Sequence, residues 1–160
     1  MSDLTIRPAT ADDLDVIVDF NARIASETED TVLDRDTLRA GVQVLLEDPA
    51  KGRYFVACVD GMVVGQVMHT REWSDWRNGD IWWIQSVYVA SSRRRLGVYT
   101  AMHQHVLKLA SADPTAVGIR LYVEKDNDGA QATYRELGMV ETDYRLFETE
   151  FDRELSPNSS

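Results

Sequence analysis

The sequence predicts an α/β domain whose mixed, mostly antiparallel sheet is flanked by helices. Two observations predict this class. Apolar residues recur at helical spacing in four segments, and short runs rich in β-branched and aromatic residues lie between those segments. The predicted order is β-α-α-β-β-β-α-β-α-β. A chain of 160 residues suits one domain, which we expect over residues 1–155, with residues 156–160 as a flexible tail.

The N-terminal part begins with a short strand at residues 4–8, which ends at a proline. Thr10 and Asp13 have the spacing of a capping box, so we expect the first helix to begin there. The segment SETEDTV at residues 26–32 breaks the apolar pattern and predicts a polar loop. A second helix should begin near Asp34 or Asp36 and end before Pro49.

The rest of the chain alternates apolar runs with turn signals. Asp60-Gly61 joins two apolar runs and predicts a two-residue hairpin turn. Residues 71–80 are expected to form a polar, tryptophan-bearing connection. Helices are expected after Gly97 and between Asp126 and Gly138. The remaining strands are predicted over residues 53–59, 62–70, 81–89, 119–125 and 139–151.

Charge and composition exclude several function classes. The formal net charge is -10 at pH 7, which argues against nucleic acid as a partner because nucleic-acid binding needs a broad basic face. No run is long and apolar enough to cross a membrane. One cysteine forms no internal disulfide, and the start of the chain lacks an apolar signal core. We therefore expect a cytoplasmic protein without a membrane partner.

The densest positive charge stands between a predicted strand and a predicted helix. Arg93, Arg94 and Arg95 directly precede Gly97 and the helix. A helix start presents unpaired N–H groups and a partial positive charge, so arginines there favour a phosphate or pyrophosphate. An exposed basic loop is the alternative. The GK[ST] ending of a P-loop is absent.

These residues resemble the acyl-CoA loop of the GNAT superfamily of acyl-CoA N-acyltransferases, which reads Arg/Gln-x-x-Gly-x-Gly/Ala. This chain has Arg94-Arg95-Leu96-Gly97-Val98-Tyr99 in that setting and departs from the pattern at Tyr99. A second family feature matches LYVEKDNDGAQATYRELGM, which holds Asn127, Tyr134 and Gly138. The element order also matches, from about Leu4 to Phe151.

The resemblance implies a donor site between two parallel strands, the fourth and fifth, which splay apart. The backbone near Val87 and Val89 would pair with the pantetheine arm, and the arginines and helix start would hold the pyrophosphate. Asn127 would cap its helix or contact the cofactor. The implied cofactor-binding residues are Val87, Tyr88, Val89, Arg94, Arg95, Leu96, Gly97, Val98, Tyr99 and Asn127.

The resemblance also implies two catalytic roles. Tyr134 would be the general acid that protonates the leaving CoA thiolate; periodicity alone favours a core residue with a bonded hydroxyl. The strand at residues 81–89 carries no carboxylate for the base. Asp80 and Glu124 remain as candidates, and we favour Glu124 working through a water molecule. Each is otherwise an exposed charge at a strand end.

Several residues are candidates for binding the acceptor. The resemblance implies that the loop between the first two helices borders the acceptor site, so Glu27, Glu29 and Asp30 in the acidic segment 26–32 would attract an amine; an exposed loop is the alternative. Trp73 and Trp83 would form an aromatic wall, and Gln85 would orient a water molecule; packing is the alternative for the tryptophans. His103 and His105 do not share a helix face, so no metal is expected.

Together these inferences predict an acetyl-CoA-dependent N-acetyltransferase. It would move an acetyl group directly to a primary amine of a small molecule or peptide, with acetyl-CoA as co-substrate. Amino acids, polyamines, antibiotic amines and protein lysines all fit as acceptors. The alternative is a non-catalytic acyl-CoA-binding regulatory or sensor domain. The resemblance is also compatible with a homodimer formed through the last strand.

Overall fold

The computed structural model describes residues 3–153. The chain divides into two compact units, Met1–Leu121 and Tyr122–Ser160, and each is described by itself. The single domain over residues 1–155 stays a prediction. The predicted tail at residues 156–160 lies outside the described residues.

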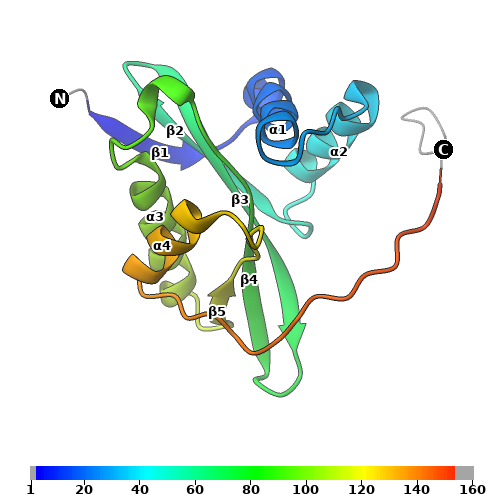
Figure 1. Cartoon of the computed structure of the whole chain (residues 1–160). Coiled ribbons are helices and arrows are strands. Elements are labelled where there is room, and N and C mark those ends of the chain that lie inside the picture. The colour runs from blue at the N-terminus through cyan, green and yellow to red at the C-terminus, as the bar shows by residue number, and fades with distance from the viewer. Residues whose placement is uncertain (1–2, 154–160) are drawn as a thin grey trace. The chain divides into compact units, whose positions relative to one another are not determined.

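The first unit contains a five-stranded sheet in the order β1-β2-β3-β4-β5, which can be followed in Figure 1. Successive strands from β1 to β4 pair antiparallel, and β5 pairs parallel with β4. The mixed, mostly antiparallel sheet is thus confirmed. The strands are β1 (Leu4–Pro8), β2 (Arg53–Val59), β3 (Met62–Ser74), β4 (Gly79–Val89) and β5 (Ala116–Arg120).

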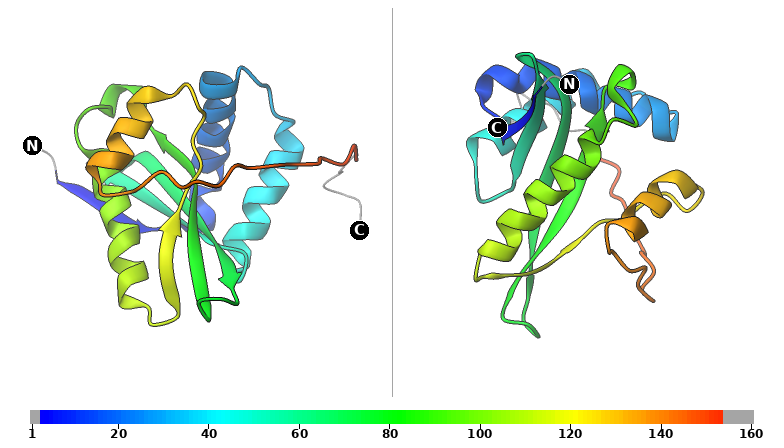
Figure 2. Two further views of the ribbon diagram at one scale, coloured as in Figure 1. Left: turned by 60° about the horizontal axis from the view of Figure 1, so that its bottom comes forward. Right: turned by 90° about the vertical axis from the view of Figure 1, so that its left-hand side faces the viewer.

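Three α-helices of the first unit cover both faces of this sheet. In the views of Figure 2, α1 and α2 lie on one face and α3 lies on the other. The second unit contributes α4. The helices are α1 (Leu14–Glu29), α2 (Arg35–Glu47), α3 (Val98–Ala112) and α4 (Asp128–Glu136), and short 3₁₀ turns at Ala11–Asp13 and Ser91–Arg93 precede α1 and α3.

Each face of the sheet buries its own apolar cluster. Beneath α3, Met102 and Val106 are fully buried against Phe55 and Val67. Beneath α1 and α2, the cluster contains Ile17, Val18, Val42, Tyr54, Val56, Cys58 and Met68. Burial of this kind stabilises a sheet by about 1.5–3 kcal/mol for each large apolar side chain.

Local signals placed several boundaries correctly. Asp60 and Gly61 both have positive φ, 52° and 77°, as a two-residue hairpin turn with right-handed strand twist requires. Asp34 is the N-cap of α2, and its carboxylate accepts a hydrogen bond of 3.0 Å from the backbone of Thr37. The backbone N–H of Thr10 donates to Asp13, in agreement with the predicted cap.

Two predicted connections are wrong because tertiary packing extends the neighbouring elements. Helix α1 continues to Glu29, so residues 26–29 are helical and not a loop. The hairpin of β3 and β4 pairs up to Ser74 and Gly79, so most of the predicted connection at residues 71–80 belongs to strands. Cross-strand pairing outweighs the polar character of the hairpin segment, and Glu27 at the end of α1 is bonded to Tyr88 and Arg94.

Two strand predictions are also wrong. β5 spans Ala116–Arg120 and not residues 119–125. Among the described residues after α4, from 137 to 153, no strand is assigned where we predicted one at 139–151. A strand requires backbone partners as well as a suitable pattern. The apolar side chains of this segment are exposed instead; they are Val140, Tyr144, Leu146, Phe147 and Phe151.

Candidate functional site

Strand β4 contains a bulge. Gln66 of β3 pairs with Tyr88, and Met68 pairs with Gln85. One residue of β3, Val67, therefore stands opposite two residues of β4. Ser86, one of those two, has a φ of 50°, which is unusual for a residue other than glycine. Bulges of this kind re-aim side chains and interrupt pairing beside functional sites.

The bulge changes which side chains face which side of the sheet. Before it, Trp82 and Ile84 belong to the cluster beneath α3. After it, Val87 and Val89 pack against the same cluster. The alternation has shifted by one residue, because an extra residue reverses the faces of all that follow. Tyr88 is consequently turned toward α1, where its ring lies 4.9 Å from that of Phe20.

The parallel pairing of β4 with β5 is short. It runs only from Asp80 and Ala116 to Trp83 and Arg120. Residues 84–89 of β4 continue beyond the end of β5, which agrees with the expected splaying of these two strands. Along that edge the backbone is suited to pairing with an extended molecule instead of with β5.

The segment after β4 leads into a helix start. Arg95 and Gly97 both have positive φ, 64° and 81°. Gly97 is the N-cap of α3 and makes no side-chain capping bond. The first N–H groups of a helix lack intrahelical acceptors, and the helix dipole adds positive potential there. Together with Arg94 and Arg95, this segment is chemically suited to an anion.

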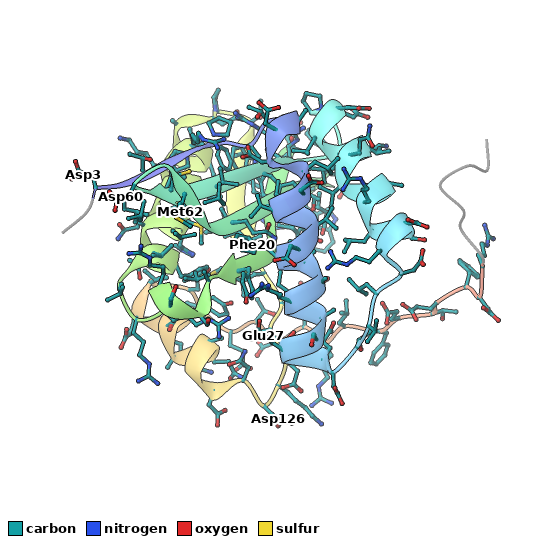
Figure 3. The ribbon with its side chains drawn as sticks, turned by 90° about the horizontal axis from the view of Figure 1, so that it is seen from above. Asp3, Phe20, Glu27, Asp60, Met62 and Asp126 are labelled. Carbon is teal, nitrogen blue, oxygen red and sulfur yellow. The ribbon has the colours of Figure 1, made fainter. Side chains whose placement is uncertain are left out.

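The side chain of Arg94 forms an ion pair and a hydrogen bond with other residues of the first unit. Its Nη2 lies 2.7 Å from Oε1 of Glu27 on α1, and its Nε donates to the backbone oxygen of Val89 at 2.9 Å. The other carboxylate oxygen of Glu27 accepts a hydrogen bond of 2.5 Å from the hydroxyl of Tyr88. Figure 3 labels Glu27 and Phe20 on α1, and the buried ring of Phe20 packs against that of Tyr88.

Electrostatics stabilise this cluster of Glu27, Tyr88 and Arg94 in one protonation state. The hydrogen bond from Tyr88, followed by that from Arg94, lowers the pKa of the Glu27 carboxyl. Burial and the bond to Glu27 raise the pKa of the Tyr88 hydroxyl, which stays a donor. Glu27 is thus a charged acceptor in a helix and does not lie in the predicted loop.

Tyr99 replaces the small residue of the family pattern. Its hydroxyl lies 3.1 Å from Nδ1 of His103, one turn further along α3. Its ring is partly buried against the cluster beneath α3. The bulky side chain of Tyr99 therefore lies against His103 and the cluster beneath α3.

In the second unit, Asn127 caps α4. Its Oδ1 accepts a hydrogen bond of 3.2 Å from the backbone of Ala130. Glu124 precedes this cap and is exposed, and its carboxylate accepts from the backbone of Asp126 at 2.8 Å. Since β5 ends at Arg120, Glu124 lies in a turn and not at the end of a strand.

Tyr134 lies in α4 and is partly buried. The helix ends just beyond it, where Gly138 has a φ of 89° and the backbone of Met139 donates to the oxygen of Tyr134 at 3.0 Å. This left-handed ending is the one that the sequence predicted. The general-acid role of Tyr134 stays a prediction.

The acceptor candidates occupy both faces of the β3–β4 hairpin. Trp83 donates to Glu72 and Gln85 donates to Thr70, each at 2.7 Å. Trp73 pairs with Asp80, so these two side chains share a face of the sheet. Asp80 and Trp83 are three residues apart in β4, and side chains alternate between faces along a strand. The two tryptophans therefore lie on opposite faces. They do not form one aromatic wall.

Sequence reasoning missed two residues of this site. Gln66 is fully buried, and its Nε2 donates to the backbone oxygen of Ser86 at 2.9 Å. The available signal was a lone amide inside the apolar run MVVGQVM, because a buried amide needs a partner. The positive φ of Ser86 had no signal in the sequence.

The part of the chain that the structure describes shows neither a metal-binding cluster nor a candidate membrane span. Within residues 3–153 no group of three or more His, Cys, Asp or Glu side chains is arranged to hold a metal ion. In the same part of the chain no helix combines the length and apolar character of a membrane span.

Comparison with known proteins identifies the family. The model of the acetyltransferase (GNAT) family matches residues 17–139, which include most of α1, the whole β3–β4 hairpin, the arginine segment and α4. The chain belongs to this family. A search of curated proteins finds no match.

Solved structures agree with this assignment. The crystal structure of a possible acetyltransferase from Clostridium difficile 630 is 48% identical, with a TM-score of 0.88 over 94% of this chain and 99% of that one. A predicted acetyltransferase with acetyl-CoA from Clostridium acetobutylicum is 17% identical, with a TM-score of 0.76 over 92% and 96%. AAC(6')-Iy with the bisubstrate analogue CoA-S-monomethyl-acetylneamine is 17% identical, with a TM-score of 0.75 over 94% and 99%. The last two show likeness of fold.

Proposed function

We propose that this GNAT protein transfers an acetyl group from acetyl-CoA to a primary amine of a small molecule or peptide. One observation carries the proposal: β4 extends past β5 at a bulge and leads directly into an arginine-bearing helix start. An extended pantetheine arm and a pyrophosphate are the two parts of CoA that this succession of strand edge and anion site would bind.

The donor would bind along the residues from β4 to α3. The backbone of Val87, Tyr88 and Val89 would pair with the amides of the pantetheine arm. Arg94 and Arg95 would contact the pyrophosphate, together with the backbone of residues 96–99. Asn127, which caps α4, would hydrogen-bond the cofactor arm. The solved neighbour with acetyl-CoA supports this donor.

The reaction would be direct transfer in a ternary complex. The amine nitrogen attacks the thioester carbonyl, a C–N bond forms, and the C–S bond breaks with release of the CoA thiolate. Tyr134 would give its proton to that thiolate. An alkylamine with a pKa of about 10 is only about one thousandth unprotonated at neutral pH, so a base is needed. Glu124, through water, is our candidate.

The acceptor would be recognised by the acidic and aromatic residues of the first unit. Glu27 would attract a protonated amine, and Trp83 and Gln85, which share one face of β4, would shape its surroundings; Trp73 lies on the other face. The bisubstrate analogue bound by AAC(6')-Iy joins CoA to an acetylated amine compound, which supports an amine acceptor.

The test is a screen of amine acceptors with acetyl-CoA, read as release of free thiol. Steady turnover with at least one amine class is the expected result. Tight acetyl-CoA binding with no turnover across all classes would instead indicate the non-catalytic acyl-CoA sensor. In calorimetry, replacing Arg94 and Arg95 with Glu should weaken acetyl-CoA binding by several kcal/mol, since each charge-assisted contact contributes about 1.5–3 kcal/mol.

A further inference from the structure

The carboxylate of Glu27 forms an ion pair with Arg94, an arginine of the proposed donor site. Glu27 is 67 positions from Arg94 in the sequence, yet its Oε1 lies 2.7 Å from Nη2 of that arginine. Both side chains are about two-fifths exposed, at 39% and 45%. An ion pair that solvent reaches is weak and exchangeable, so another anion of higher charge can take the guanidinium.

Three further contacts define the geometry of this pair. Nε of Arg94 donates to the backbone oxygen of Val89, and the guanidinium carbon lies 5.3 Å from the ring centre of Tyr88. The hydroxyl of Tyr88 donates to the second oxygen of Glu27. Glu27 is therefore held by donors from β4 and from the arginine segment at once. The negative charge of Glu27 lies beside Arg94, where the pyrophosphate of the donor would place its own two negative charges.

We propose that Glu27 is an internal competitor of the donor's pyrophosphate: its carboxylate holds Arg94 until the pyrophosphate replaces it. This inference rests on the proposed function, because it names a regulation of the same donor site. Donor binding then exchanges one anion for another on Arg94 and releases the Glu27 carboxylate. The released carboxylate keeps its bond from Tyr88 and becomes available to a cation.

The bulge in β4 explains why this competition exists in this chain. If β4 alternated regularly from Trp82 to Tyr88 with no bulge, Tyr88 would face the cluster beneath α3, as Trp82 and Ile84 do. The shift instead turns the Tyr88 ring and hydroxyl toward α1 and Glu27. The same irregularity that frees the edge of β4 thus also positions the competing carboxylate.

A double-mutant cycle in CoA binding tests the proposal. The probe is CoA itself, measured by calorimetry with the full chain. Glu27→Gln keeps the shape and removes the charge, and it should tighten CoA binding about two- to fivefold, the range that an exposed ion pair supports. In the Arg94→Gln background the same substitution should have no such effect, because the contested guanidinium is gone.

Two comparisons make the result decisive. Glu29→Gln removes the same charge at the exposed end of α1 without touching Arg94, so it should leave CoA affinity unchanged. The proposal would be overturned if Glu29→Gln tightened CoA binding as much as Glu27→Gln does, or if Glu27→Gln tightened it equally with and without Arg94. Either result would mean that the carboxylates repel CoA generally and do not compete with it for Arg94. If thermal melting shows that Glu27→Gln does not fold, Glu27→Ser replaces it in the same cycle.

The outcome also separates this inference from the proposed function. A wild-type chain that does not bind CoA contradicts the donor site itself. A wild-type chain that binds CoA, with an affinity that Glu27→Gln leaves unaltered, contradicts only the role of Glu27.

Discussion

The side-chain amide of Gln66 donates a hydrogen bond of 2.9 Å to the backbone oxygen of Ser86. This bond joins β3 to the bulge of β4, where Ser86 has a positive φ. A buried amide that satisfies an irregular carbonyl stabilises that irregularity, because the bulged peptide lacks its usual ladder partner. The donor edge of β4 therefore depends on a side chain of the neighbouring strand.

The first prediction concerns this bond. Gln66→Met keeps the length of the side chain and removes the donor, so acetyl-CoA affinity should fall about three- to tenfold as the bulge relaxes, in line with one lost hydrogen bond. Stability should change by no more than about 1 kcal/mol, since Oε1 of Gln66 has no partner among the described residues. Calorimetry and thermal melting measure both. Gln43→Met on the exposed face of α2 is the control; an unaltered affinity in Gln66→Met contradicts the role of the bulge.

The second prediction tests Tyr134 as the general acid. Tyr134→Phe keeps the ring and removes the proton donor, so kcat should fall about 10²-fold or more with little change in acetyl-CoA affinity. Steady-state kinetics with the best amine of the screen provide the measurement. Tyr144→Phe, an exposed tyrosine of the same unit, serves as the control. A loss of affinity at constant kcat would make the hydroxyl a binding group instead.

The third prediction separates the two candidate bases. Ser86 lies six residues after Asp80 in β4, so Asp80 is about 20 Å along the strand from the bulge. Glu124→Gln should lower kcat/KM about 10²-fold near neutral pH, with partial recovery as rising pH frees the amine. Asp80→Asn should have little effect. Full activity of Glu124→Gln across the pH profile would mean that the amine arrives already deprotonated from bulk water.

The fourth prediction concerns stability in acid. His69 is fully buried, and its ring stacks on Trp82 with centroids 4.1 Å apart. Burial, with smaller contributions from Arg71 and Arg53, lowers the pKa of His69 from 6.5 to about 4. The unfolded chain therefore binds more protons between these values, so stability falls as the pH drops from about 6.5 toward 4, by about 3 kcal/mol in total.

Urea unfolding between pH 7 and pH 4.5 measures this loss. His69→Phe fits the aromatic stack and removes the titrating group, so it should flatten most of the pH dependence. Part of it should remain, because burial also lowers the pKa of His103 and of His105. His105→Gln is the matched control. An identical slope in wild type and His69→Phe would show that other groups govern acid stability.

The fifth prediction concerns self-association. Large apolar side chains of residues 139–153 are exposed, among them Tyr144 at 79% and Phe147 at 92%. Large exposed apolar side chains gathered in one segment are typical of an interaction surface, and we predict that a second copy of the chain buries them. Sedimentation velocity should find a dimer, and Tyr144→Lys with Phe147→Lys should shift it to monomer. Trp76→Lys, exposed in the first unit, should leave it intact; a monomeric wild type contradicts the prediction.

The features that the sequence predicted correctly are those set by interactions between residues close together in the chain. Asp60-Gly61 forms its turn, Asp34 and Asn127 cap their helices, and Gly97 opens α3, because the energies involved arise within a few residues. The arginine segment and its helix start were predictable for the same reason. The family resemblance rested on these local features.

Only the tertiary structure decided the relationships between distant segments. The bulge at Ser86 depends on the register with β3, and that register reverses the faces of the residues after it. The end of β5 at Arg120 and the contact of Glu27 with Arg94 likewise depend on how strands and helices pack. The sequence of each segment allows several such partners, and the choice among them is made by backbone pairing and burial summed over the whole sheet.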